Sequence, residues 1–170
     1  MTTLDRKHTA LLAEAERRGL PGLDDIRLCF QALSLAAQID RECAAALAPH
    51  GLSEGRFVML FLLAGVPQGL APHVLAERAG VTRATVTGLL DGLERDALLE
   101  RHRDPADRRG LHVRLTAKGG ELAEAVFARH AQWIATRFAG LSARERASLA
   151  KLLAKAAAGP DSATPPATAT

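Results

Sequence analysis

The chain has 170 residues, of which 48% are hydrophobic and 24% charged, with a formal net charge of +3 and a pI near 9.3. This length allows one domain with a buried core but not two independent ones, and the composition excludes wholesale disorder. No apolar run approaches the roughly 18–20 residues of a membrane span, the polar N-terminal residues lack a signal-peptide pattern, and two cysteines are too few for a disulfide framework. We therefore expect a cytoplasmic protein with no membrane partner.

Residues 1–22 are predicted to form an extra N-terminal helix and a linker, which the Leu20-Pro21-Gly22 break ends. A long helix over residues 23–48 follows, with Asp24 and Asp25 at its positive N-terminal end. Its apolar side chains cover more than one face, which predicts a partner chain that packs against it. Ser53 is expected to cap the next helix, over residues 53–64.

Residues 71–115 are predicted to form a winged helix-turn-helix. A short helix over residues 71–79 begins with Pro72, and Gly80-Val81 form a tight turn. Thr82 then caps a helix that runs to about Asp96 and carries one apolar stripe. Two strands, 99–103 and 111–115, are joined by the segment 104–110, and the second strand shows the two-residue alternation of a half-buried strand.

Two more helices complete a single domain over residues 23–157. Thr116 is expected to cap the first, which runs to about Ala139, and a capping box at Ser142-Ala143-Arg144-Glu145 opens the second. The last helix is expected to bury its leucines, which are Leu149, Leu152 and Leu153. The Ala/Thr/Pro tail, residues 158–170, cannot bury apolar surface and is expected to be disordered. The predicted fold class is mostly α (α+β).

The helix that begins at Thr82 suits the major groove of DNA, because a helix-turn-helix presents the start of its second helix to base edges. The side chains expected to bind bases and phosphates there are Thr82, Arg83, Thr85 and Thr87. Ala84 and Gly88 leave room for the duplex to approach. Small polar residues at a helix start also serve as simple caps, so this run alone does not decide between the two roles.

The segment between the two strands adds independent weight to the DNA hypothesis. Residues 78–118 hold nine basic and six acidic side chains, so this stretch carries a net charge equal to that of the whole chain. Arg108 and Arg109 are predicted at the tip of the hairpin, where an arginine can enter the electronegative minor groove. Asp107 is placed to orient Arg109 through a charge-assisted hydrogen bond. A solvated polar turn is the alternative, but a basic tip at this distance after a helix-turn-helix favours DNA binding.

The segments LERDALLER, DPADRR and LTAKG resemble the winged-helix core of the MarR family of regulators, and the resemblance covers about residues 23–157. It implies a homodimer in which helices 23–48 and 117–157 intertwine, bound to double-stranded DNA at a pseudo-palindromic operator. It places Arg83, Thr85 and Thr87 in the major groove and Arg109 in the minor groove. It also implies a transcriptional regulator, usually a repressor, that is relieved by a small aromatic or anionic ligand.

Two residues are candidates for the group that responds to an oxidant or a ligand and so controls DNA binding. Leu28-Cys29-Phe30 resembles the context of the reactive cysteine in family members that sense organic hydroperoxides, which makes a redox-sensing regulator one alternative. The chain has no tyrosine to hydrogen-bond the thiolate, and a cysteine on an apolar helix is usually an inert small side chain. Arg56 is a candidate partner for a ligand carboxylate, and a plain surface charge is equally consistent with its position.

The sequence offers no enzyme signature. It contains no Gly-rich phosphate loop, no G-x-S-x-G elbow and no paired Cys/His spacing, and its histidines lack metal-ligand spacing. We therefore expect no enzyme activity, no cofactor and no metal. The remaining alternative is a helical adaptor that uses a winged helix for protein docking without binding DNA.

Overall fold

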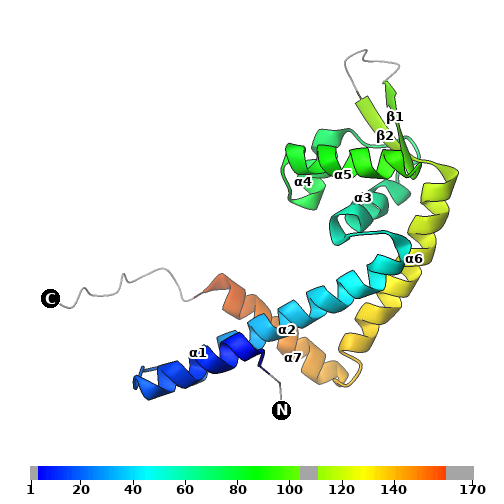
Figure 1. The fold of residues 1–170 in the computed structure, drawn as a ribbon. Helices are drawn as coiled ribbons and strands as arrows, with labels where there is room; N and C mark the ends of the chain where they lie inside the picture. The colour runs from blue at the N-terminus through cyan, green and yellow to red at the C-terminus, as the bar shows by residue number, and fades with distance from the viewer. Residues whose placement is uncertain (1–3, 104–110, 160–170) are drawn as a thin grey trace. The chain divides into compact units, whose positions relative to one another are not determined.

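The computed structural model describes residues 4–103 and 111–159. The chain divides into two compact units, Met1–Phe127 and Ala128–Thr170. In the first, elements run α1 (Arg6–Arg17), α2 (Leu23–Leu47), the short 3-10 helix η1 (Ala48–His50), α3 (Glu54–Ala64), α4 (Pro72–Ala79), α5 (Arg83–Arg95), β1 (Leu99–Arg103) and β2 (Leu111–Leu115) (Figure 1). Helix α6 (Ala117–Arg137) continues from the first unit into the second, which also holds α7 (Ala143–Ala158). The fold is mostly helical with one small antiparallel sheet, as predicted.

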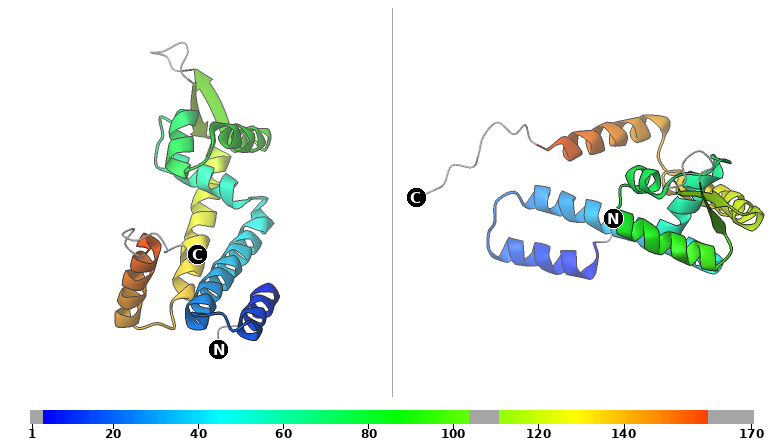
Figure 2. Two further views of the ribbon diagram at one scale, coloured as in Figure 1. Left: turned by 90° about the vertical axis from the view of Figure 1, so that its left-hand side faces the viewer. Right: turned by 90° about the horizontal axis from the view of Figure 1, so that it is seen from above.

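Helices α1 and α2 lie side by side, as two further views show (Figure 2). Leu12 and Ala15 are the buried apolar residues of α1. A polar cluster joins the helices as well, because the buried Ser34 hydroxyl of α2 lies 2.9 Å from the His8 ring nitrogen Nδ1 and accepts a hydrogen bond from the Asp5 backbone N–H. The His8 ring also stacks on Phe30 at 4.8 Å between centroids. The N-terminal helix is thus packed on α2 by both apolar and polar contacts.

The main core lies under the helix-turn-helix and the sheet. Helices α3, α4 and α5 gather beside the two strands (Figure 1), and their inward side chains are almost fully buried because each helix has one apolar stripe that needs cover. The end of α2 and the two strands add to this core, and its largest fully buried side chains are Leu47, Met59, Leu60, Leu75, Val86, Leu90, Leu93, Leu99 and Val113. This core fixes where α5 lies relative to the strands.

The two strands pair in register from Leu99 with Leu115 to Arg103 with Leu111. Leu70, in the loop before α4, adds a further bridge to β2: its N–H donates to the Val113 carbonyl at 3.0 Å, and the Val113 N–H donates to the Leu70 carbonyl at 2.9 Å. Gly69 precedes it with a φ of 82° and comes so close to β2 that a Cβ would overlap the Val113 carbonyl oxygen. Only glycine meets both requirements, so this residue lets the loop reach the sheet.

The turn from α5 to β1 is held by the start of α6. Thr116 caps α6, since its hydroxyl accepts from the Gly119 N–H at 3.0 Å, and the same hydroxyl donates to the Ala97 carbonyl at 2.8 Å. The Lys118 ammonium donates to the Asp96 carbonyl at 2.9 Å. Ala97 itself takes a φ of 57°, which is unusual for a residue with a side chain. The end of α5 and the start of α6 are therefore fixed to each other.

In the second unit, Ser142 caps α7 through the predicted capping box with Glu145. The expectation that α7 buries its leucines is wrong for the single chain, because no residue of α7 is buried and Leu152 and Leu153 are 64% and 55% exposed. Helical periodicity shows which side chains share a face but not what covers that face. No helix in the described part of the chain has the length and apolar character needed to cross a membrane.

Candidate nucleic-acid interface

Helix α5 exposes the side chains that the sequence singles out. Thr82, Arg83, Thr85 and Thr87 are all exposed, whereas Val86, Leu90 and Leu93 on the opposite side are at most 1% exposed. Ala84 is also exposed, and a Cβ at Gly88 would meet nothing within 4 Å. The outer face of the first two turns is therefore narrow and polar. A face of this kind can approach the edges of base pairs.

The threonine hydroxyls of α5 are already engaged within the helix. The Thr82 hydroxyl accepts from the Thr85 N–H at 3.1 Å and lies 2.8 Å from the Thr85 hydroxyl. The Thr87 hydroxyl donates to the Arg83 carbonyl at 3.0 Å. Each hydroxyl oxygen has two lone pairs, so these groups keep hydrogen-bonding capacity toward a ligand. Thr82 thus combines the predicted cap with an exposed position at the positive end of the helix dipole.

Four of the basic side chains in residues 78–118 show two different uses of positive charge. Arg101, Arg114 and Lys118 are bound within the fold: Arg101 to carboxylates, and the other two to the carbonyls of Gln68 and Asp96. Arg83 is exposed, and within residues 4–103 and 111–159 its guanidinium has neither a carboxylate nor a carbonyl partner. Arg83 is thus available for an external anion, whereas part of the local positive charge serves the fold.

The predicted wing residues Asp107, Arg108 and Arg109 lie outside the described residues. Strand β1 is described as far as the exposed Arg103, and β2 begins at Leu111, which is 37% exposed. The roles assigned to the three wing residues therefore stay predictions.

Arg101 is a feature that sequence reasoning missed. It lies on the same side of the sheet as the buried Leu99, yet it is charged. Its guanidinium donates to the Asp91 carboxylate at 2.6 Å and to the Glu94 carboxylate at 2.9 Å, both on α5. The signal in the sequence was a charge at an inward position of the strand, together with two carboxylates spaced i, i+3 on the preceding helix.

Arg56 joins α3 to the end of α5. Its guanidinium forms an ion pair with the Asp96 carboxylate and donates to the Gly51 carbonyl at 3.1 Å. The hydrogen bond from the Arg56 guanidinium to the Asp96 carboxylate holds the pKa of Asp96 below its ordinary value, and the nearby charges of Arg95 and Lys118 contribute less. The guanidinium that the sequence offers as a partner for a ligand carboxylate is thus occupied by a carboxylate of its own chain.

The two cysteines have different surroundings. Cys29 is exposed on α2, and in the described part of the chain no hydrogen bond reaches its sulfur. Cys43 is half-buried, and burial raises the pKa of its thiol, with further contributions from the negative charges of Glu54 and Asp40. A raised pKa keeps a thiol protonated and unreactive. Of the two, only Cys29 is open to reagents.

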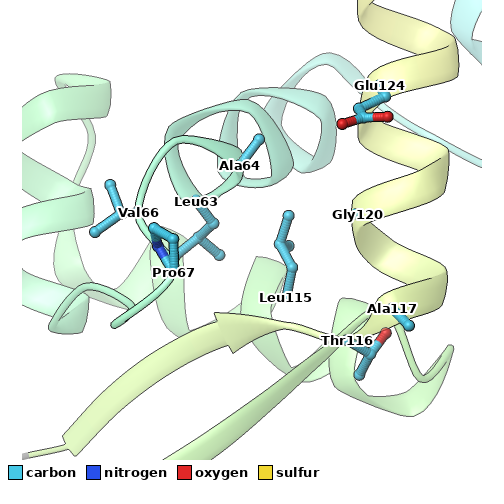
Figure 3. A pocket seen from close by; sticks show the side chains of 9 residues that line it. All are labelled: Leu63, Ala64, Val66, Pro67, Leu115, Thr116, Ala117, Gly120 and Glu124. Atoms are coloured by element: carbon cyan, nitrogen blue, oxygen red, sulfur yellow. The ribbon is translucent and has the colours of Figure 1, made fainter.

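A cavity of about 300 Å³ lies between the end of α3, the loop after it, the end of β2 and the start of α6 (Figure 3). Its lining is mostly apolar and consists of Leu63, Ala64, Val66, Pro67, Leu115, Thr116, Ala117, Gly120 and Glu124. Glu124 is the one charged residue in this lining. Figure 3 shows its carboxylate on α6, on the side that faces α3. No group of three or more metal-binding side chains is found among the residues that the structure describes.

Comparison with known proteins places this geometry in a family. Residues 50–110 match the model of the MarR family. The HTH-type transcriptional regulator YkoM of Bacillus subtilis (strain 168) is 43% identical over 63 residues, which are 37% of this chain and 41% of that protein. The chain thus matches about two-fifths of the length of this curated relative.

Solved structures resemble a larger part of the chain. The S. aureus MepR–DNA complex has a TM-score of 0.65 at 26% identity, covering 73% of this chain and 91% of that one. Apo MarR from E. coli has a TM-score of 0.61 at 27% identity, covering 71% and 90%. The PcaV regulator from Streptomyces coelicolor, in complex with its natural ligand, has a TM-score of 0.61 at 26% identity, covering 74% and 91%. The narrow polar helix face, the two-stranded sheet and these relatives identify residues 50–110 as a segment of the MarR family type, and the chain shares its winged helix-turn-helix fold with solved MarR-family regulators.

Proposed function

We propose that this protein is a dimeric transcriptional regulator that binds double-stranded DNA through α5 and its wing. The observation that carries the proposal is the outer face of α5, where Arg83, which has no partner among the described residues, and three threonines lie opposite a fully buried stripe. The MepR relative is known in complex with DNA, which supports the same use of the shared fold here. Arg83 and Thr85 are assigned to base edges in the major groove, and Arg108 and Arg109 to the minor groove.

The exposed apolar side chains support a homodimer. Large hydrophobic residues on three helices are between 44% and 65% exposed in the single chain, and these are Leu28, Leu33 and Leu35 of α2, Phe127 and Ile134 of α6, and Leu152 and Leu153 of α7. Large apolar side chains that stay exposed in the single chain mark an interaction site. A two-fold dimer would present two copies of α5 to half-sites about one helical turn apart, roughly 10 base pairs, on a pseudo-palindromic operator.

DNA binding is tested with a labelled duplex from the region upstream of the protein's own gene. Fluorescence anisotropy should show an affinity that falls steeply with salt, because phosphate contacts release counterions. Arg83→Ala should cost about 1–3 kcal/mol at the contacted base pair and relax the sequence preference. If Arg83→Ala lowers the affinity for all duplex sequences equally, Arg83 contacts a phosphate instead of a base. If the protein does not bind duplex DNA at low ionic strength, and Arg109→Ala changes nothing in this measurement, the protein is the helical adaptor of the alternative hypothesis.

We propose that repression is relieved by a small aromatic ligand in the cavity of Figure 3. The volume and apolar lining suit a ligand about the size of one substituted ring. The lining contains the Glu124 carboxylate and no Lys, Arg or His, so it favours a neutral or cationic ligand over an anionic one. Thr116 lines the cavity and also donates to the Ala97 carbonyl, so a ligand that contacts Thr116 is linked through its hydroxyl to the turn that follows α5.

Three probes with one ring and different charges test this ligand class: phenethylammonium, phenylethanol and phenylacetate. A ligand that binds the native protein raises its melting temperature by mass action. Phenethylammonium should raise the melting temperature most and phenylacetate least. Glu124→Gln should remove this order, whereas Glu121→Gln, on the same helix but outside the lining, should keep it. A larger shift with phenylacetate would contradict the assignment.

The redox alternative rests on the exposed thiol of Cys29. If it is correct, peroxide should release the protein from DNA, and Cys29→Ser should abolish that response. Cys43→Ser is the matched control, because the Cys43 thiol is half-buried and has a raised pKa. An unchanged peroxide response in Cys29→Ser would exclude this role.

A further inference from the structure

We infer that Arg101 is a positioning residue for DNA binding, which fixes the wing relative to α5 through Asp91 and Glu94; this inference rests on the proposed function. The wing and α5 are assigned to adjacent grooves of one duplex. Productive contact in both grooves therefore requires a fixed angle and distance between the hairpin and the helix. Groups that hold this geometry in the free protein reduce the ordering cost that DNA binding must meet.

The geometry singles out Arg101 for this role. It is at the centre of β1, and its guanidinium reaches two carboxylates one turn apart on α5, at 2.6 and 2.9 Å. A planar guanidinium that binds two acceptors holds a direction as well as a distance. The side chain is 26% exposed, so it is covered more than a free surface arginine and lies beside the helix rather than in solvent.

The position along the strand matters as much as the contacts. Leu99, at the start of β1, is held by the core, and the buried Val113 opposite Arg101 holds β2, but neither contact sets the angle between β1 and α5 through charged side chains. Arg103, two residues beyond Arg101 on the same side of the sheet, is exposed and has no ion pair with the part of the chain described here. Arg101 is therefore the outermost point of β1 at which the described residues tie the hairpin to α5.

An alternative would use the same arginine differently. An arginine near the interface could bind a phosphate directly, with Asp91 and Glu94 only holding it until DNA arrives. The two roles predict opposite effects when the carboxylates are neutralised. Removing negative charge beside a polyanion should tighten binding, and it should also release Arg101 for direct contact. If Arg101 fixes the wing, the same change should weaken binding.

The experiment measures duplex affinity of Asp91→Asn/Glu94→Gln as a function of salt, with the upstream duplex as the probe. We expect affinity to fall about tenfold, with a shallower dependence of log K on log salt, because a wing that is not held makes fewer phosphate contacts. Glu77→Gln is the matched control: it removes an exposed carboxylate from α4 without touching Arg101, and it should bind as tightly as wild type or tighter.

Two further variants separate position from stability. Arg101→Lys keeps the charge but cannot bind two carboxylates in one plane, so its affinity should fall between wild type and Arg101→Ala. Melting temperatures identify variants that lose affinity by unfolding. If the wild type binds the duplex and Asp91→Asn/Glu94→Gln binds it equally or more tightly, the positioning role is wrong and the proposed function stands. Absence of wild-type binding overturns the proposed function, and the positioning role with it.

Discussion

At the scale of single residues, the fold depends on a few atoms that leave no room for substitution. The first turn of α6 passes so close to the turn before β1 that a Cβ on Gly119 would overlap the Leu98 carbonyl oxygen. That carbonyl also accepts the Thr116 N–H at 3.2 Å. Because a backbone atom cannot move aside cheaply, this contact requires glycine.

Two adjacent glycines give a matched test of this contact. Gly119→Ala should lower the free energy of unfolding by about 1–3 kcal/mol, since the start of α6 must shift away from Leu98. Gly120→Ala should raise it by roughly 0.5–1 kcal/mol, because its Cβ meets nothing within 4 Å and alanine is the better helix former. Urea denaturation of both variants checks the prediction, and equal effects of the two would contradict it.

The ion pair between Arg56 and Asp96 predicts a pH dependence. Since the folded state lowers the pKa of Asp96 from its ordinary value of 3.8, the pair stabilises the protein above that value and loses this contribution as pH falls through the lowered pKa. Asp96→Asn should therefore reduce stability near pH 7, and the difference from wild type should shrink as pH falls from 3.8 through the lowered pKa of Asp96. Denaturation across this range measures it; a difference independent of pH would show that the carboxylate charge is not involved.

At the scale of elements, Thr82 at the start of α5 has two roles, one in capping the helix and one in the proposed contact with DNA. Thr82 caps the helix through the Thr85 N–H and is also exposed where DNA is proposed to bind. Capping requires only a side-chain oxygen acceptor, and the positive end of a helix favours negative charge. Contact with a polyanion requires the opposite charge. The two roles can therefore be separated by charge.

Thr82→Asp should keep the melting temperature at or above that of wild type, since aspartate is a good cap. The same variant should lose most DNA affinity, because it adds a negative charge at each recognition helix. Ser53→Asp is the control, as it makes the same change at the cap of α3. Circular dichroism and anisotropy report the two properties separately. Unchanged affinity in Thr82→Asp would place the duplex away from this end of α5.

Elements of this fold were predictable where their signals are local. The caps at Thr82 and Ser142 rest on residues within one turn of each other, and the structure has them as predicted. Strand β2 has the predicted bounds, but the predicted alternation is only partly present, because Val113 is buried whereas Leu111 is exposed. The partners of Arg101 and Arg56 were not predictable in the same way, since each pair joins two elements whose relative placement the sequence pattern does not specify. The leucines of α7 show a third case, in which the face was identified but the described part of the single chain does not bury it.

At the scale of the whole molecule, the exposed leucines of α7 couple the stability of the protein to its assembly with a second chain. A helix that buries nothing in its own chain is stabilised by packing only when another chain covers it. An obligate dimer of this type unfolds at a temperature that rises with protein concentration. The proposed dimer should show this dependence.

Leu152→Asp should convert the protein from a species of twice 18.0 kDa to one of 18.0 kDa in sedimentation velocity, and it should abolish binding to a two-half-site duplex. Ala154→Asp is the control, because it puts the same charge on the far side of α7, about 200° around the helix axis. A dimer that survives Leu152→Asp would show that α7 is not part of the interface.

The bridge between Leu70 and Val113 has a consequence for the protein's behaviour in solution. A ribbon of two strands leaves two outer edges whose unpaired amides can recruit a strand from another molecule. Here the loop before α4 occupies the outer edge of β2 at its midpoint, through the hydrogen bonds in both directions that Leu70 makes with Val113. Gly69 therefore protects against aggregation as well as shaping a turn: it lets the chain reach this edge and cover it with its own backbone before another molecule does.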